Sequence, residues 1–262
     1  MICFPGFNIV LNIKKVAFTI FGISIYWYAV CIVLAMMVSI FLCCKSKIKY
    51  EISEDFILEN LIYVIIFGIL GARMYYVIFN LYYYLQNPIQ ILRIRDGGLA
   101  IYGGIIAGAL VSFWRCKKSK KSYKNFLDRI SPYVALGQAI GRWGNFFNQE
   151  AYGTETSNIF RMGINTEVGY QEVHPVFLYE SMATFLIFII LRELQKNRHF
   201  KGEICYLYLF FYSAVRMFLE GVRIDSLMLQ NFRISQILSL AIFVVFGIML
   251  LKKYVKYRYS NT

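Results

Sequence analysis

Residues 20–42 read IFGISIYWYAVCIVLAMMVSIFL, and they contain no charged side chain. A helix needs roughly 20 mostly apolar residues to cross the hydrocarbon core of a membrane. This stretch is long enough for that, and it is too long to be the apolar core of a signal peptide. It therefore predicts a membrane-spanning helix.

The composition of the whole chain of 262 residues agrees with a membrane protein. Hydrophobic residues make up 58% and charged residues 16%, whereas a soluble globular domain carries about 25% charged residues. The mean hydropathy is +0.53. The 23 Phe and 21 Tyr exclude a disordered chain, because disordered segments are poor in aromatic residues. Six cysteines are too sparse over this length for a secreted disulfide scaffold.

Six further apolar stretches reach or approach the length of a membrane span. They lie at residues 56–79, 99–114, 130–147, 175–191, 204–219 and 234–251. Together with residues 20–42 they predict an all-α, polytopic integral membrane protein of about seven transmembrane helices. Arg73 interrupts the first of the six, and its depth in that span predicts a structural role.

The distribution of basic residues predicts the orientation. A net charge of +13 would suggest a nucleic-acid partner in a soluble protein. In an apolar chain it indicates basic cytoplasmic loops instead, since lysine and arginine collect on that side of a membrane. Most of the basic residues follow the first, third, fifth and seventh predicted spans. This alternation predicts an external N-terminus, a cytoplasmic C-terminus and no nucleic-acid partner.

The chain shows no internal repeat, so we expect a single membrane-embedded domain over residues 1–262. Residues 148–174 form the only long stretch without apolar continuity, and the charge pattern makes this polar segment external. The missing repeat also weakens an interpretation as an inverted-repeat transporter.

The fourth predicted span carries a polar signature. Residues 141–150 read GRWGNFFNQE. At roughly 100° per residue, a helix gathers Gln138, Arg142, Asn145 and Gln149 into one stripe beside a stripe of glycines. The glycines allow a neighbouring helix or a lipid to approach the backbone. Arginine keeps its charge and presents a planar fork of donors that fits phosphate. A structural arginine satisfied by carbonyls or a carboxylate is the plainer interpretation, but charged groups inside spans usually serve function.

A second polar face lies on the sixth predicted span, where helical spacing aligns Tyr212, Arg216, Glu220 and Arg223. Arg216 and Glu220 could simply neutralise each other. The additional arginine leaves a net positive charge. The two faces therefore predict two unpaired arginines in the outer half of a membrane cavity, which suits a phospholipid phosphate.

Glycines concentrate ahead of the third predicted span. Residues 96–104 read DGGLAIYGG, and Gly108 follows. Such a run suits a bend or a re-entrant entry into the membrane, with its backbone open to a ligand.

The sequence lacks the residue patterns that several common catalytic sites require. Two His and no CxxC motif argue against zinc or an iron–sulfur cluster. Unpaired aspartates argue against a Mg²⁺-dependent phosphotransferase, which needs a carboxylate cluster. No GxSxG elbow is present for serine hydrolysis. We therefore expect no metal ion in the site.

The polar signature resembles that of the bacterial prolipoprotein diacylglyceryl transferase family, which reads G-R-x-G-N-F-x-N-x-E. Further blocks resemble the family in the same order along the chain. These blocks are Gly71-Ala72-Arg73 with Tyr76, the glycine-rich residues 97–104, His174-Pro175 with Leu178-Tyr179-Glu180, Arg216 and Glu220 with Arg223, and Ser235-Gln236-Ile237-Leu238-Ser239.

The resemblance implies an activity and a location. The family transfers the diacylglyceryl group of phosphatidylglycerol to the lipobox cysteine thiol in the signal peptide of a preprolipoprotein. A thioether forms and glycerol 1-phosphate leaves. The resemblance also implies a multi-pass enzyme of the bacterial plasma (inner) membrane, surrounded by membrane lipids, with an outward-facing site and no cofactor.

The resemblance further implies site residues. Arg142 and Arg216 would bind the phosphate and stabilise charge on the leaving oxygen. Glu150 and Glu220 would hold the arginines or accept the thiol proton, two roles that the sequence leaves open. Tyr102 stands where many members have His, so we expect its hydroxyl to orient the lipid rather than to act as a base. The other implied substrate-binding residues are Tyr26, Gly103, Gly104, Asn145, Asn148 and Arg223.

Two other functions fit the binding arginines alone. One is a transporter or flippase for an anionic lipid or solute, and the other is a non-catalytic lipid-binding scaffold. Only the enzyme would release glycerol phosphate in the presence of a lipobox peptide.

Overall fold

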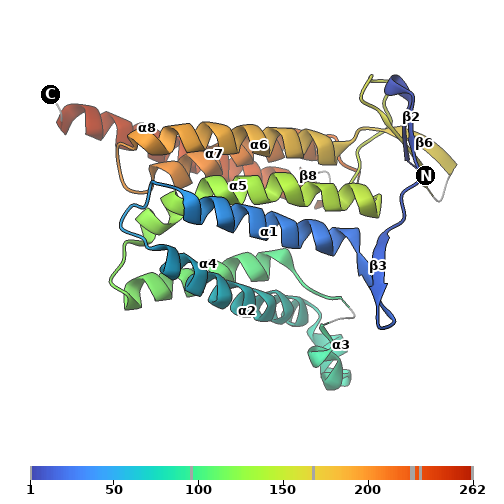
Figure 1. The fold of residues 1–262 in the computed structure, drawn as a ribbon, viewed down its shortest axis with the longest axis horizontal. Helices are drawn as coiled ribbons and strands as arrows, with labels where there is room; N and C mark the ends of the chain where they lie inside the picture. Colours follow the sequence, from blue (N-terminus) through green and yellow to red (C-terminus); the bar gives the residue numbers. More distant parts are fainter. Residues whose placement is uncertain (1, 95–96, 167–168, 225–227, 230–231, 261–262) are drawn as a thin grey trace. The chain divides into compact units, whose positions relative to one another are not determined.

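The chain folds into two compact units in a computed structural model (Figure 1). The described residues are 2–94, 97–166, 169–224, 228–229 and 232–260. The first unit combines Met1–Ile48 with Leu127–Thr262, and the second is Lys49–Phe126. The first unit is therefore discontinuous in sequence, and it holds both arginine-bearing faces.

Long helices make up most of the first unit. They are α1 (Trp27–Lys45), α5 (Tyr123–Asn148), α6 (Val176–Leu194), α7 (Glu203–Glu220) and α8 (Ile234–Ser260), of which α5 begins in the second unit. Helix α6 packs on α7, and α7 packs on α8. The core between these helices is apolar and contains Ala135, Ile187, Leu191, Ile204, Leu207 and Leu250.

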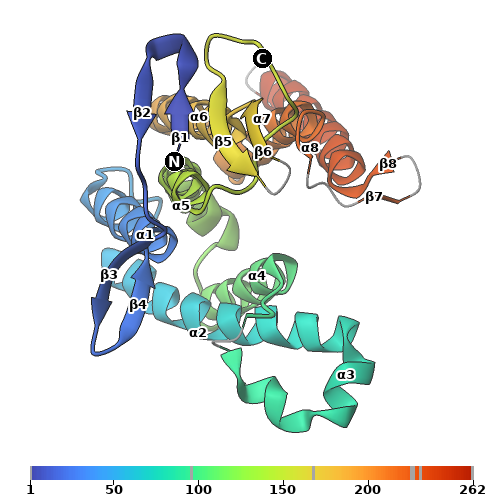
Figure 2. The ribbon, with the colours of Figure 1, turned by 90° about the vertical axis from the view of Figure 1, so that its right-hand side faces the viewer.

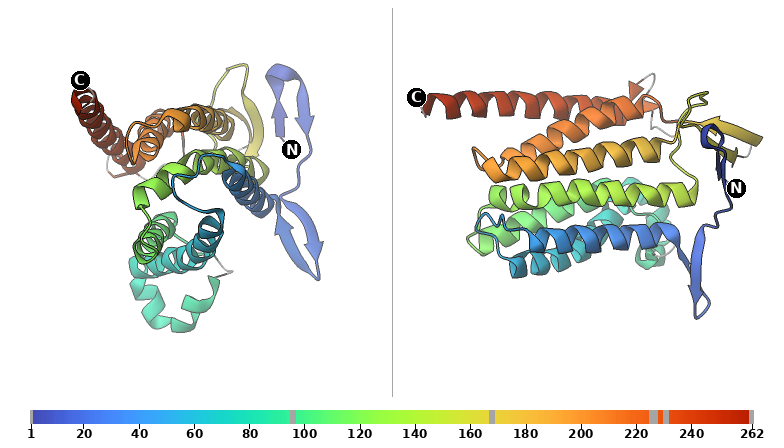
Figure 3. Two further views of the ribbon diagram at one scale, coloured as in Figure 1. Left: turned by 60° about the vertical axis from the view of Figure 1, so that its left-hand side comes forward. Right: turned by 45° about the horizontal axis from the view of Figure 1, so that its top comes forward.

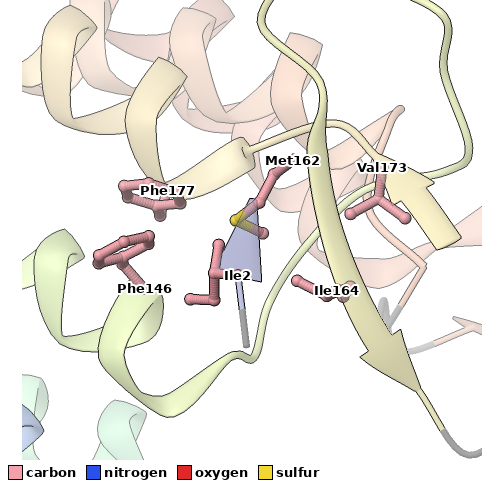
Figure 4. Packing of buried hydrophobic residues seen from close by; sticks show 6 residues of the cluster. All are labelled: Ile2, Phe146, Met162, Ile164, Val173 and Phe177. Carbon is pink, nitrogen blue, oxygen red and sulfur yellow. The ribbon is translucent and has the colours of Figure 1, made fainter. Parts of the chain in front are cut away.

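A four-stranded antiparallel sheet lies at one end of these helices (Figures 2 and 3). Its order is β2-β1-β5-β6, and its strands are β1 (Ile2–Phe4), β2 (Ile9–Leu11), β5 (Met162–Thr166) and β6 (Gly169–Val173). The sheet packs on the last turns of α5 and the first turn of α6 through Phe146 and Phe177 (Figure 4). Those two rings join Ile2, Met162, Ile164 and Val173 in one buried cluster.

The all-α prediction is wrong for this sheet. Each strand has only three to five residues, and β1 pairs with β5 so that Ile2 lies opposite Ile164. Pairing over such a distance in sequence leaves no local periodicity that could indicate it. The predicted external segment, residues 148–174, supplies both β5 and β6.

The first predicted span also begins too early. Residues 20–26 belong to a hairpin of β3 (Val16–Ile20) and β4 (Ile23–Tyr26), and α1 starts only at Trp27. Phe21 and Gly22 form the turn, both with positive φ, as a two-residue hairpin turn of the primed type requires. The overall hydropathy of the stretch hid this strand pattern. A further short hairpin joins β7 (Met228–Leu229) to β8 (Phe232–Arg233).

A buried carboxylate caps the first turn of α7. It lies at the end of the helix bundle that is far from the sheet. Asp128, on α5, is 0% exposed. It accepts hydrogen bonds from the backbone N–H groups of Gly202 at 2.6 Å and Cys205 at 3.0 Å. A carboxylate there satisfies N–H groups that a helix leaves unpaired in its first turn, and it suits the helix dipole. Arg198 donates to the same carboxylate at 2.8 Å, so this cluster ties α5 to α7.

The second unit contains α2 (Glu54–Phe79), α3 (Leu81–Gln86), a 3₁₀ turn η2 (Pro88–Leu92) and α4 (Ile101–Lys118). Helices α2 and α4 pack together through glycines. A Cβ atom on Gly71 or Gly103 would overlap the carbonyl oxygen of the other residue. Small residues at these positions therefore set the close approach of the two helices.

Three helices of the described chain are long and apolar enough to cross a membrane: Trp27–Lys45, Glu54–Phe79 and Ile234–Tyr259. The other predicted spans fall on α4, α5, α6 and α7, with bounds that differ by up to four residues except at the start of α5, which begins seven residues before the predicted residue 130. The chain is thus a mostly helical membrane protein with an added sheet.

Candidate active site

Arg142 lies near the C-terminal end of α5, close to the sheet. Its Nη2 donates to Oε1 of Glu180 at 2.6 Å, and its Nη1 lies 3.4 Å from Oδ1 of Asn145. The Glu180 side chain is 0% exposed, whereas that of Arg142 is 24% exposed. Arg142 therefore remains partly accessible, whereas the carboxylate that it binds is fully buried.

Arg216, on α7, binds the other oxygen of the same carboxylate. Its Nη1 donates to Oε2 of Glu180 at 3.2 Å, and its Nη2 donates to Oε2 of Glu220 at 2.5 Å. Tyr212, one turn earlier, donates its hydroxyl to Oε1 of Glu180 at 3.1 Å. Glu180 thus joins three helices, because it is on α6 while its partners are on α5 and α7.

This pairing corrects the prediction of unpaired arginines. Arg142 and Arg216 contribute two positive charges, and Glu180 and Glu220 contribute two negative charges within direct contact. The expected i, i+4 pair of Arg216 with Glu220 is present. Glu180, which binds both arginines, was not among the predicted site residues.

Glu180 had two signals in the sequence. It is an acidic residue inside a predicted span, which is expensive and usually functional. It also ends the block that begins at His174 and Pro175. In the structure α6 begins at Val176, directly after the proline, so Glu180 comes early in the helix and lies near the sheet.

Asn145 extends the network toward the sheet. Its Nδ2 donates to Oε1 of Glu150 at 3.0 Å. The backbone holds this arrangement, because the N–H of Glu150 donates to the carbonyl of Asn145 at 3.1 Å just beyond the end of α5. Asn148 is the last residue of α5. The chain then continues through Gln149 and Ala151, both with positive φ.

The backbone of Arg223 forms an isolated bridge with Gly153, in the segment that was predicted to be external. The N–H of Thr154 also donates to the carbonyl of Val222 at 2.9 Å. The segment after α5 and the segment after α7 are therefore held together next to the two arginines.

The predicted glycine stripe of α5 is confirmed as a packing surface for α1. A Cβ atom on Gly144 would lie 2.8 Å from the Tyr28 ring, and one on Gly137 would lie 3.1 Å from Oγ of Ser39. Tyr26 ends β4 directly before α1 and is 50% exposed. The glycines thus bring the start of α1 close to the arginine-bearing helix.

Three predicted site residues belong to the second unit. Tyr102, in the first turn of α4, is 42% exposed. Gly103 faces α2 at its contact with Gly71, and Gly104 faces Gly68, whose carbonyl oxygen would lie 3.3 Å from an added Cβ. Their predicted role in substrate binding stays a prediction. The described part of the preceding glycine run begins at Gly97, so Asp96 lies outside the described residues.

Arg73, also in the second unit, is buried, and its hydrogen-bond partners among the described residues are backbone carbonyl groups between α3 and α4. The acceptors are Gln90 at 2.5 Å, Ile91 at 3.0 Å, Arg93 at 3.3 Å, Gly97 at 2.8 Å and Gly98 at 3.0 Å. These contacts favour the predicted structural role.

The donor set offers nothing that suits a metal ion. Across the described residues, no three side chains of His, Cys, Asp or Glu come together as a ligand group. The acidic groups near Arg142 and Arg216 are bound by arginines or by an amide. The arrangement suits an anionic group that accepts hydrogen bonds from the two guanidinium groups in place of some of their present partners.

Comparison with known proteins gives consistent matches over most of the chain. A family model described as prolipoprotein diacylglyceryl transferase matches residues 15–252. A phosphatidylglycerol–prolipoprotein diacylglyceryl transferase of Finegoldia magna is 46% identical over 243 residues, which cover 92% of this chain and 96% of the relative. Proteins of the same name from Clostridium novyi and Enterococcus faecalis are 42% and 41% identical, over 92% and 89% of this chain and 95% and 88% of those relatives.

Proposed function

The chain belongs to the prolipoprotein diacylglyceryl transferase family, and on that basis we propose how its arginine–glutamate cluster serves the reaction. The protein is a membrane enzyme that transfers the diacylglyceryl group of phosphatidylglycerol to a prolipoprotein. The family membership does not favour the transporter or flippase alternative.

The acceptor in our proposal is the thiol of the lipobox cysteine in the signal peptide of the preprolipoprotein. Its sulfur attacks the glycerol carbon of the diacylglyceryl group, and the bond from that carbon to the phosphate oxygen breaks. A thioether forms, glycerol 1-phosphate takes the bonding electrons, and the thiol proton passes to a base. A thiol has a pKa of about 8.5, so only a few per cent is ionised at neutral pH.

Arg142 and Arg216 are the groups that we propose to hold the phosphate. The second Nη of each guanidinium contacts Asn145 in the case of Arg142 and Glu220 in the case of Arg216. Both side chains are partly exposed while Glu180 is buried, so a phosphate can reach these donors and exchange with their present partners. The leaving phosphate gains negative charge as the bond breaks, so donors fixed in advance stabilise the transition state more than the bound lipid. Glu180 would keep the two guanidinium groups in register before the lipid arrives.

Glu150 is the carboxylate that we propose to accept the thiol proton. The carboxylate oxygens of Glu180 and Glu220 are already occupied by arginine donors. Glu150 is held by the neutral amide of Asn145 and is exposed. We propose that Asn145 and Tyr26 orient the head group, that Gly103, Gly104, Asn148 and Arg223 border the bound substrates, and that the Tyr102 hydroxyl orients the lipid.

We propose that α1, α2 and α4 to α8 all cross the plasma membrane in a multi-pass arrangement, with the N-terminus outside and the C-terminus in the cytoplasm. Arg142 and Arg216 lie near the C-terminal ends of their helices, on the side of the sheet. The basic residues Arg192, Lys196 and Arg198 lie at the opposite end of the same unit. Basic residues mark the cytoplasmic side, which supports an outward-facing site.

A turnover assay tests the proposed reaction. The full-length protein in phosphatidylglycerol vesicles should release glycerol phosphate only when a peptide with a lipobox cysteine is present. The same peptide with serine in place of that cysteine is the control, and it should give no release and no lipidated product. Activity should survive EDTA, since we expect no metal ion. Release of glycerol phosphate without an acceptor thiol would contradict the proposed transfer.

A further inference from the structure

The hairpin of β3 and β4 has one apolar and one polar face. Ile20 lies opposite Ile23, and Phe18 lies opposite Ile25, so these four side chains share a face. Thr19 lies opposite Ser24 on the other face. The short two-stranded hairpin is therefore amphipathic.

The apolar face of this hairpin is open. Phe18 is 48% exposed, Ile20 47% and Ile23 58%. In the described part of the chain, β3 and β4 pair only with each other, and Figure 2 shows them apart from the four-stranded sheet. A two-stranded hairpin alone is marginally stable in water, so its apolar face needs a covering.

Phe21, at the tip of the turn, is 100% exposed and has φ +48°. A bulky side chain is disfavoured in this left-handed conformation, where asparagine or glycine is usual. A large apolar residue at a strained and fully open position indicates that its side chain has an apolar environment outside the protein fold.

The hairpin continues directly into a helix with a lipid-facing surface. Tyr26 ends β4, and Trp27 begins α1. The backbone N–H of Trp27 donates to the carbonyl of Lys15 at 3.0 Å, which ties the start of the helix to the base of the hairpin. Met37 and Phe41, further along α1, are 63% and 56% exposed. The hairpin thus extends the apolar surface of a membrane-spanning helix.

Aromatic and basic residues place this junction at the level of the lipid head groups. Tyr26, Trp27 and Tyr28 follow one another where β4 becomes α1, and such amphipathic rings gather at the membrane–water boundary. Lys14 and Lys15 are exposed at the base of β3, and residues 12–30 contain no acidic side chain. The local charge therefore complements anionic phospholipid head groups.

From these observations we propose that the β3–β4 hairpin is a lipid anchor, which lies on the membrane beside α1. Ile20, Phe21 and Ile23 enter the acyl-chain region, and Thr19 and Ser24 face water. Lys14 and Lys15 contact the phosphates of anionic lipids. The occupant of the open face is the bilayer itself, not another protein.

Photo-crosslinking of the full-length protein tests this placement. A photoreactive phenylalanine analogue is placed singly at Ile20, Phe21, Thr19 or Ser24, and each protein is inserted in vesicles of phosphatidylcholine with phosphatidylglycerol. We expect lipid adducts, mapped by mass spectrometry to acyl carbons, to be several-fold more abundant at Ile20 and Phe21 than at the matched positions Thr19 and Ser24. All four positions are exposed, so the labels disturb no core packing.

Two results would overturn the proposal. One is equal lipid labelling on both faces of the hairpin. The other is labelling of an added preprolipoprotein, in place of lipid, from Ile20 and Phe21, because the open face would then be a peptide-binding surface. A second measurement tests the charges: Lys14→Gln with Lys15→Gln should lower labelling from Phe21 several-fold more in vesicles that contain phosphatidylglycerol than in pure phosphatidylcholine. If labelling from Phe21 fell equally in both kinds of vesicle, Lys14 and Lys15 would not contact anionic head groups, and that part of the proposal would be wrong.

Discussion

Arg142 and Arg216 share one buried counter-ion, since they bind opposite oxygens of the Glu180 carboxylate from two different helices. Two guanidinium groups this close would repel each other without the carboxylate between them. The shared glutamate therefore makes a paired arginine site possible inside a membrane protein. Both arginine side chains remain partly exposed, and it is there that we propose the phosphate binds.

We expect Arg142→Lys and Arg216→Lys each to lower turnover by about 10²–10³, the usual cost of removing one donor from a charge-stabilising site. Lysine keeps the charge but not the planar fork that holds a carboxylate and a phosphate together. The measurement is the rate of glycerol phosphate release at matched protein amounts. Arg161→Lys is the control, because Arg161 forms a partly exposed pair with Glu172 on the sheet, and it should stay near normal. Near-normal turnover in Arg142→Lys would rule out direct phosphate contact.

Glu180→Gln should reduce both stability and turnover. Removing one partner of a buried ion pair costs about 3–5 kcal/mol of the free energy of unfolding, and here Arg142 loses its counter-ion while Arg216 keeps only Glu220. Thermal unfolding in detergent and specific activity of the folded fraction measure the two effects. Glu172→Gln breaks a partly exposed pair and should cost only about 0–1 kcal/mol. If the two variants behave alike, the shared counter-ion has no special role.

Glu150→Gln should slow the transfer most at low pH. If Glu150 accepts the thiol proton, the variant depends on thiol that is already ionised. That fraction grows as the pH approaches the thiol pKa of about 8.5, so the deficit relative to the unmodified protein should shrink as pH rises. The pH dependence of kcat/KM measures this. A deficit that is constant with pH would assign Glu150 to holding Asn145 instead.

Tyr102→Phe should retain a measurable part of the activity. A phenol hydroxyl is a poor base at neutral pH, and loss of one neutral hydrogen bond costs about 0.5–1.5 kcal/mol. Tyr102→Ala should lose more, because the aromatic ring is removed as well. Turnover of both variants at matched expression decides the point. If Tyr102→Phe is as inactive as Arg142→Ala, the phenol takes part in the chemistry.

Arg73→Gln should lower the amount of folded protein more than the specific activity of what remains. Arg73 is buried and binds several carbonyl groups of the loop before α4, and each buried polar group left unpaired costs about 1–3 kcal/mol. Quantitative blotting of membranes and activity per folded molecule separate the two effects. Lys118→Gln, at the exposed end of α4, is the control. A normal protein level with lost activity would place Arg73 in the reaction.

Local patterns in the sequence predicted the helices well, because apolar runs and helical spacing are properties of neighbouring residues. The pair of Arg216 with Glu220 followed from spacing on one helix, and the glycines of α5 followed from one helical stripe. The link through Glu180 could not follow in this way, since it depends on how α5, α6 and α7 pack. The hairpin before α1 was hidden for another reason: its residues are as apolar as the helix that follows, and hydropathy alone does not separate the two.

The pairing of β1 with β5 has a consequence for how the protein is made. Ile2 leaves the ribosome before its partner Ile164, which follows much later. At about 5–20 residues per second, the wait is on the order of 10–30 s. Strand β2 is made directly after β1 and can pair with it, but throughout that time the other edge of β1, which pairs with β5, has no partner, and the apolar side chains of Ile2 and Phe4 are uncovered. The sheet can therefore be completed only after the chain has been synthesised past β5. A chain that stalls before that point would expose an unpaired strand edge to chaperones and proteases.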